Sequence, residues 1–274
     1  MKSLVIFIRS CIRIFSGWSN IIIVRIECII YVIIYSIYRA TNAMTEIIET
    51  NIRRIFDESI FKIEFMRTSI GLNVIISNKK DNDNSCLILR VNSNKIIRLD
   101  TLDRCDVGNE GKGNALIRKV NELALSLPEY NSIKLIDTSH ITLCDTITVK
   151  LSHLKILTKG MSWYNSHGYY SENNAAEVKH NNSFITSKIH KIPVLRDILK
   201  VDDSESSYPK VKPTDTVQVY VSRMLKSIES ASSFSGLTKC GKVQKKKADN
   251  LKNIVELLSP LLIYDNKLTK MVSR

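Results

Sequence analysis

The chain has 274 residues, of which 44% are hydrophobic, a composition that is ordinary for a globular protein with a sizeable core. Its six cysteines form neither a CxxC pair nor a dense framework, which argues against structural zinc and a disulfide scaffold and favours a reducing compartment. The formal net charge of +13 favours an anionic partner, namely nucleic acid, an anionic membrane or a phosphorylated cofactor.

An apolar run over residues 20–38 is long enough to cross a bilayer. Arg25 and Glu27 interrupt this run, and Met44 begins a stretch that looks like an ordinary soluble N-terminus. Residues 1–43 are therefore either a membrane anchor, acting through residues 20–38, or a dispensable extension. We expect a cytoplasmic protein, which the first alternative would tether to a membrane.

Short periodic segments follow this N-terminal region. Residues 46–56 have apolar side chains at helical spacing, and residues 60–66 and 72–76 are short apolar runs that predict strands. Residues 86–91 and 95–99 flank a polar Asn-Ser-Asn turn, which predicts a β-hairpin. The second arm of this hairpin leads into a glycine-rich loop.

From residue 114 the apolar pattern changes to a period of 3.6, which predicts a helix over residues 114–127 that ends at Pro128. Residues 132–136 form a further apolar strand candidate. A strand, a loop, a helix and a strand in this order predict a βαβ unit with parallel strands.

The C-terminal half of the chain is predicted to be mainly helical. A second amphipathic helix is expected over residues 147–157, and the polar, Asn-rich residues 173–214 are predicted to be a linker. Residues 215–274 are predicted to be a helical extension, with helices at 215–230 and 248–258. The lysine-rich run at residues 242–247 is interpreted as a solvated, disordered charge run.

The glycine-rich loop has the chemistry of an anion cradle. A loop that enters a helix presents unpaired backbone N–H groups and the positive end of the helix dipole, and glycines let the main chain approach a phosphate closely. The alternative is a simple flexible turn, because the spacing matches neither a Walker loop nor a Rossmann fingerprint. The residues expected to form the cradle are Gly108, Asn109, Gly111, Lys112, Gly113 and Asn114.

About fifty residues downstream the chain reads Trp163-Tyr164-Asn165-Ser166-His167-Gly168-Tyr169. A Gly-x-Gly loop at a helix start followed by an aromatic-Tyr-x-x-x-Gly-aromatic turn resembles the GCN5-related N-acetyltransferase superfamily. The amino-acid sequence of this turn also resembles uncharacterised proteins of large DNA viruses. The resemblance covers residues 44–172 and implies an acyl-CoA N-acyltransferase-like α/β fold, a mixed sheet flanked by helices.

The same resemblance implies acetyl-CoA as cofactor and direct acetyl transfer to an unknown amine. Tyr164 would protonate the departing thiolate. Asp137 and His140 are the nearest groups able to take a proton from the amine, with a turn or cap residue as the alternative interpretation of each. Gly108 stands where the family has Gln or Arg, and Leu157 stands where many members have Asn. These departures favour two alternatives, an inactive acetyltransferase-fold binding or scaffold protein and a basic protein that binds nucleic acid or a membrane surface.

Overall fold

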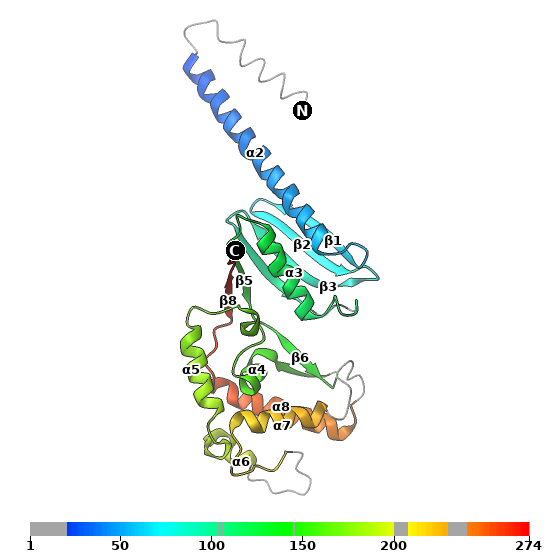
Figure 1. The fold of residues 1–274 in the computed structure, drawn as a ribbon, viewed down its shortest axis with the longest axis vertical. Coiled ribbons are helices and arrows are strands. Elements are labelled where there is room, and N and C mark those ends of the chain that lie inside the picture. The colour runs from blue at the N-terminus through cyan, green and yellow to red at the C-terminus, as the bar shows by residue number, and fades with distance from the viewer. Residues whose placement is uncertain are drawn as a thin grey trace.

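The computed structural model describes residues 21–273 except residues 104, 106, 145, 200–207 and 230–239. It has an α/β fold built on a mixed six-stranded sheet flanked by helices, with a second cluster of helices beside it (Figure 1). The α/β class with a mixed, helix-flanked sheet is therefore confirmed. The strands of the large sheet are β1 (Phe61–Thr68), β2 (Gly71–Asn78), β3 (Asp81–Asn92), β4 (Ile96–Leu102), β5 (Ser132–Ile136) and β8 (Lys267–Met271).

Strand order in this sheet is β1-β2-β3-β4-β5-β8. The first four strands form an antiparallel meander, which confirms the predicted hairpin of β3 and β4. β4 and β5 are parallel, as the βαβ pattern predicted, because a crossover through helix α3 (Gly113–Ser126) joins them. β8 closes the sheet antiparallel to β5, so the last residues of the chain join a sheet that is otherwise complete by residue 136.

Helix α2 (Ile21–Ile55) is longer than the predicted helix over residues 46–56. Its C-terminal turns bury Ile48, Ile52 and Ile55 against the sheet, whereas side chains of residues 29–38 are largely exposed where the helix extends beyond the sheet (Figure 1). Within the described ranges, no helix is both long and apolar enough to cross a bilayer. The helix runs without a break through the expected boundary at residue 43.

Helices α2 and α3 pack on the same face of the large sheet, and their apolar stripes form the first core with it. The alternating strand residues that point to this face are buried, as in β2, where Leu72, Val74 and Ile76 are no more than 2% exposed. In α3 the same is true of Leu116 and Val120, two members of the predicted stripe. The opposite face of the sheet carries polar and partly exposed side chains.

A second core lies below the large sheet in Figure 1. It is formed by a small antiparallel sheet of β6 and β7 together with short helices that pack around α8. These elements are β6 (His140–Leu143), β7 (Ile147–Lys150), α4 (Leu151–Lys159), α5 (Asn174–Ile185), η3 (Ile189–Lys191), η4 (Pro193–Leu195), α6 (Arg196–Leu199), α7 (Val217–Glu229), α8 (Lys242–Leu258) and η5 (Ser259–Leu261). The short helix η2 (Asn165–His167) lies between Tyr164 and Tyr169, which belong to the first core.

Four expectations differ from this structure. Residues 147–150 form β7 and not the first turn of a helix, because Ile147 and Val149 are buried with a period of two. The expected linker at residues 173–214 contains α5 and three shorter helices, whose apolar residues enter the second core. The expected helical extension ends in strand β8. The lysine-rich run forms the first turns of α8.

Candidate functional site

A cleft of about 550 Å³ opens at the C-terminal ends of the parallel strands β4 and β5, beside the N-terminus of α3. Parallel strands that diverge at this end leave space between them that no strand pairing fills. The cleft is lined by Leu99, Asp100, Thr101, Leu102, Asp103, Lys112, Gly113, Asn114, Leu135, Ile136, Thr138, Ser139, His140, Leu151, Trp163 and Tyr164. It thus brings together the helix start of the glycine-rich loop, Tyr164 and His140.

Three of the six residues predicted for the anion cradle line this cleft, namely Lys112, Gly113 and Asn114. Lys112 is the N-cap of α3 and its side chain makes no capping hydrogen bond. Within the described residues the backbone N–H groups of Gly113 and Asn114 have no hydrogen-bond partner, whereas the Ala115 N–H donates to the Lys112 carbonyl over 2.9 Å. Gly113 and Asn114 therefore offer two free donors at the positive end of the helix dipole. This is an arrangement that can bind an anion.

The other predicted cradle residues shape the loop and do not line the cleft. Gly108 has φ +67°, in the left-handed region, and Asn109 is exposed beside it. Gly111 is buried, and a Cβ at this position would lie 2.7 Å from the Cβ of Cys105. The Gly111 carbonyl also accepts a hydrogen bond of 3.0 Å from the Cys105 backbone N–H, so the loop closes on Cys105.

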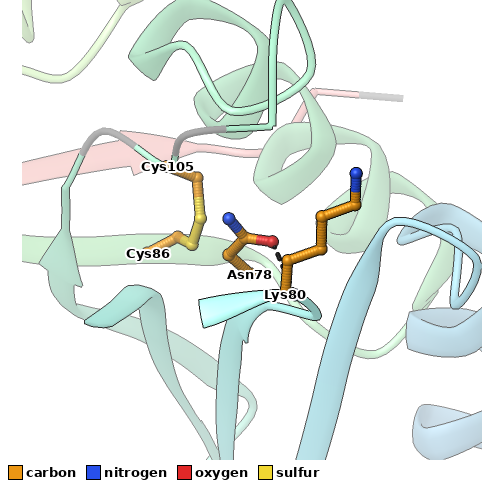
Figure 2. Close-up of a disulfide and its surroundings, with 4 residues drawn as sticks. All are labelled: Asn78, Lys80, Cys86 and Cys105. Carbon is orange, nitrogen blue, oxygen red and sulfur yellow. Dashed lines mark hydrogen bonds between the residues drawn. A yellow bond between two sulfur atoms is a disulfide. The ribbon is translucent and has the colours of Figure 1, made fainter. Parts of the chain in front are cut away.

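Cys105 is paired with Cys86 of β3 in a disulfide, with the two Cα atoms 5.2 Å apart (Figure 2). Figure 2 shows this pair beside the β2–β3 turn, where the Lys80 backbone N–H donates to the Asn78 side chain over 2.9 Å. A second disulfide joins Cys144 to Cys240. The expectation of no disulfide framework is therefore wrong for these four cysteines, because the partners are 19 and 96 residues apart and no local spacing motif reveals them.

The tyrosine-containing turn contacts the α3 N-terminus directly. Trp163 Nε1 donates a hydrogen bond of 3.2 Å to Asn114 Oδ1, and a ring nitrogen of His167 lies 3.1 Å from the same oxygen. Gly168 ends the turn with φ +85°, a conformation that favours glycine. Tyr169 is fully buried and its hydroxyl donates to Asn121 of α3. The turn and the helix are thus held together at both ends.

Tyr164 is 7% exposed, and it lines the cleft next to Trp163, whose ring centroid lies 4.8 Å from its own. Within the part of the chain that the structure describes, its hydroxyl has no hydrogen-bond partner. Burial raises the pKa of Tyr164 above its ordinary value, and the charges of Asp137 and Asp103 act in the same direction. The phenol is therefore protonated at neutral pH and available as a donor to a ligand in the cleft.

The predicted proton acceptors Asp137 and His140 have different surroundings. Asp137 is buried and does not line the cleft; its carboxylate accepts hydrogen bonds from the Tyr264 hydroxyl and from the Ser139 backbone N–H and hydroxyl. His140 is exposed at the start of β6 and lines the cleft. Of the two, His140 is the group that a ligand in the cleft can reach.

Some residues that support the site were not predicted from the sequence. Tyr264 binds Asp137 from 127 residues away, and Lys270 of β8 donates to the His167 carbonyl over 2.8 Å. Burial lowers the pKa of His167, with Lys270 adding to the effect, so that the His167 ring is neutral at neutral pH. No local pattern predicted these contacts, because residues 264–271 reach the site only in the folded chain, where β8 pairs with β5 and with Tyr170.

Comparison with known proteins gives no match for this chain: no protein-family model matches the sequence, no curated protein matches it, and no solved structure matches the fold.

Proposed function

We propose that the chain is an acetyl-CoA-dependent N-acetyltransferase that transfers an acetyl group to an amine by direct attack. The observation that carries this proposal is the cleft, which combines an uncapped helix N-terminus with a buried phenol. The helix N-terminus, with Lys112, offers donors for a pyrophosphate, and the phenol of Tyr164 lines the same cleft. The proposal extends the resemblance of the loop and the turn to the acetyltransferase superfamily.

In the proposed reaction the amine nitrogen attacks the thioester carbonyl carbon, a C–N bond forms and the C–S bond breaks. The amine loses a proton and the departing sulfur gains one. Because the pKa of Tyr164 is raised above that of a thiol, its phenol acts mainly as a hydrogen-bond donor to the developing thiolate. His140 takes the proton of the amine, directly or through water. Positioning and hydrogen-bond donation then supply most of the catalysis.

A second candidate is an acyl-CoA-binding protein with no catalytic activity. One observation favours it: the Asp137 carboxylate, a predicted proton acceptor, is already bound by Ser139 and Tyr264. In that case the cleft would bind the cofactor but the bound thioester would be stable.

The first test is thermal unfolding of the full chain with and without acetyl-CoA. At 100 times its dissociation constant a ligand stabilises the folded state by about 2.7 kcal/mol. A saturable increase in the melting temperature supports the cofactor site, and a desulfo or adenine-only fragment of the cofactor should give a smaller increase. No change in the melting temperature at the highest acetyl-CoA concentration would exclude both candidates.

The second test separates catalysis from binding. Thiol release from acetyl-CoA is measured with a panel of primary amines, for the native chain and for Tyr164→Phe. Loss of the donor should lower kcat by about 10²-fold while the acetyl-CoA-induced stabilisation is unchanged. Binding without thiol release, for any amine, would leave the non-catalytic candidate.

A further inference from the structure

The face of the large sheet opposite α2 and α3 carries a row of cations. Arg90 of β3 pairs in register with Arg98 of β4, which pairs with Lys134 of β5. These side chains point away from the first core, and the Arg90 and Arg98 side chains are 40% and 47% exposed. Neighbouring strands lie roughly 4.8 Å apart, so the three charges form a continuous positive strip across the sheet.

This strip is only partly neutralised. Asp100 accepts from both arginines, at 2.6 Å from Arg90 and 2.9 Å from Arg98, so that one carboxylate serves two cations. Within the residues described, Lys134 forms no ion pair, and Lys267 of β8 adds another exposed cation beside it. An excess of positive charge at fixed positions favours an extended anion.

A groove of about 1150 Å³ lies over β4, β5 and β8 on this face. Its floor includes Arg98, Lys134 and Lys267, and one wall is the segment that contains Tyr170. Tyr170 is 48% exposed, held by backbone pairing with Thr269 of β8. A groove with cations on neighbouring strands suits a strand-shaped polyanion better than a flat membrane surface.

The same face offers groups that recognise bases. The Oδ1 atoms of Asn73 and Asn92 and the Nε of Arg90 are buried, and within the described chain they have no hydrogen-bond partner. Asn92 lines the groove, and its side-chain amide is a group that can pair with the edge of an unpaired base. The exposed ring of Tyr170 is a surface for stacking.

We propose that this open face of the sheet binds single-stranded nucleic acid. Arg98, Lys134 and Lys267 contact the phosphates, and Tyr170 and Asn92 contact the bases. A duplex is disfavoured because its bases are stacked and paired and cannot reach Tyr170 and Asn92. The carboxylates of Glu172 and Asp265, which also line the groove, repel the backbone and confine it to the strand side.

The test uses the full chain and fluorescence anisotropy with labelled single-stranded RNA and DNA of about 12 nucleotides, with a duplex of the same sequence as a competitor. The triple variant R98Q/K134Q/K267Q should bind at least about tenfold more weakly and reduce the slope of log K against log salt by about 0.7 per cation removed. A matched control is K242Q/K245Q/K247Q, which removes the same charge from α8 in the second core.

Two further variants keep the test decisive if the triple variant is unstable. Tyr170→Ala should weaken binding by about tenfold through lost stacking, and Glu172→Gln should strengthen it. The proposal is overturned if neither RNA nor DNA binds at low salt, if the α8 control loses as much affinity as the groove variant, or if the duplex competes equally well. The increase in melting temperature with acetyl-CoA measures binding at the cleft beside α3 and not at this groove. The two proposals can therefore fail independently of each other.

Discussion

The indole nitrogen of Trp163 lies 3.2 Å from the side-chain oxygen of Asn114, and this hydrogen bond joins the tyrosine-containing turn to the start of α3. His167 shares the same oxygen at 3.1 Å. Asn114 therefore connects the two motifs that the sequence separates by about fifty residues. It also lines the cleft, where the first N–H groups of α3 are available to a ligand.

Asn114→Ala should lower the free energy of unfolding by about 1–2 kcal/mol, because two donors lose one acceptor. Asn114→Asp is the matched control: it keeps the acceptor and is favourable at a helix N-terminus, so stability should be retained. The added negative charge should nevertheless weaken acetyl-CoA binding. Denaturant unfolding and the acetyl-CoA-induced change in melting temperature measure the two effects; equal stability of the Ala and native chains would contradict the connection.

The loss of stability on substituting each loop glycine should depend on the space around its Cα atom and on its φ angle. A Cβ at Gly111 would press on Cys105, which should cost about 1–3 kcal/mol and displace the loop. Gly108→Ala should cost about 1 kcal/mol, since its Cβ meets nothing within 4 Å and only its positive φ is unfavourable. Gly113→Ala should be nearly neutral, with its nearest contact 3.4 Å away in Trp163. Thermal unfolding of the three variants checks this order, and a Gly108 variant less stable than the Gly111 variant would contradict it.

Asp137 is expected to act in stability and not in proton transfer. Asp137→Asn should lower the free energy of unfolding by about 1–3 kcal/mol, because the carboxylate that binds Tyr264 and Ser139 is replaced by a weaker acceptor. Tyr264→Phe should give a loss of the same order, and the two losses should not add. Denaturant unfolding of both single variants and the double variant provides this cycle. A pH profile of thiol release that shifts in Asp137→Asn would instead identify Asp137 as the base.

Stability should decrease below about pH 6.5, the ordinary pKa of histidine. Burial lowers the pKa of His167 and of His153 in the folded chain, with Lys270 and Lys150 respectively adding to the effect. The unfolded chain therefore binds these protons more readily, so the stability present above pH 6.5 is lost as the pH falls toward the folded values. Thermal unfolding between about pH 7.5 and pH 5 should show this, above the range where carboxylates titrate. The double variant H153Q/H167Q should show a flatter profile over the same range.

A dithiol that reduces the two disulfides should lower the free energy of unfolding. On the chain-entropy model, the Cys144–Cys240 pair closes a 96-residue separation and contributes about 4–5 kcal/mol, and Cys86–Cys105, with a separation of 19, contributes about 3 kcal/mol. Cys240→Ser should therefore reproduce more of the effect than Cys105→Ser. Thiol labelling of the unfolded, unreduced chain is the control, since reactive thiols at these four positions would show that the pairs are not formed.

Local patterns predicted the elements whose information lies in a short window. The period of 3.6 in residues 114–127 corresponds to α3, and the alternation around the Asn-Ser-Asn turn corresponds to the β3–β4 hairpin. The βαβ order also predicted that β4 and β5 are parallel, because a crossover of this kind has few alternatives. The apolar pattern was misleading at residues 147–150, because it fits the periods of both a helix and a strand. Packing against α8 decides for strand β7.

The sequence by itself determined the glycine-rich helix start, the tyrosine-containing turn and their order, since each depends on residues within one turn or strand. Only the tertiary structure decided that Asn114 joins these two motifs and that the Tyr264 hydroxyl donates a hydrogen bond to Asp137. It also decided that cations from three strands align on the open face of the sheet. These relationships link residues that are distant in the chain. They follow from strand register and from packing, which depend on the summed contacts of the whole fold and leave no mark in a local window.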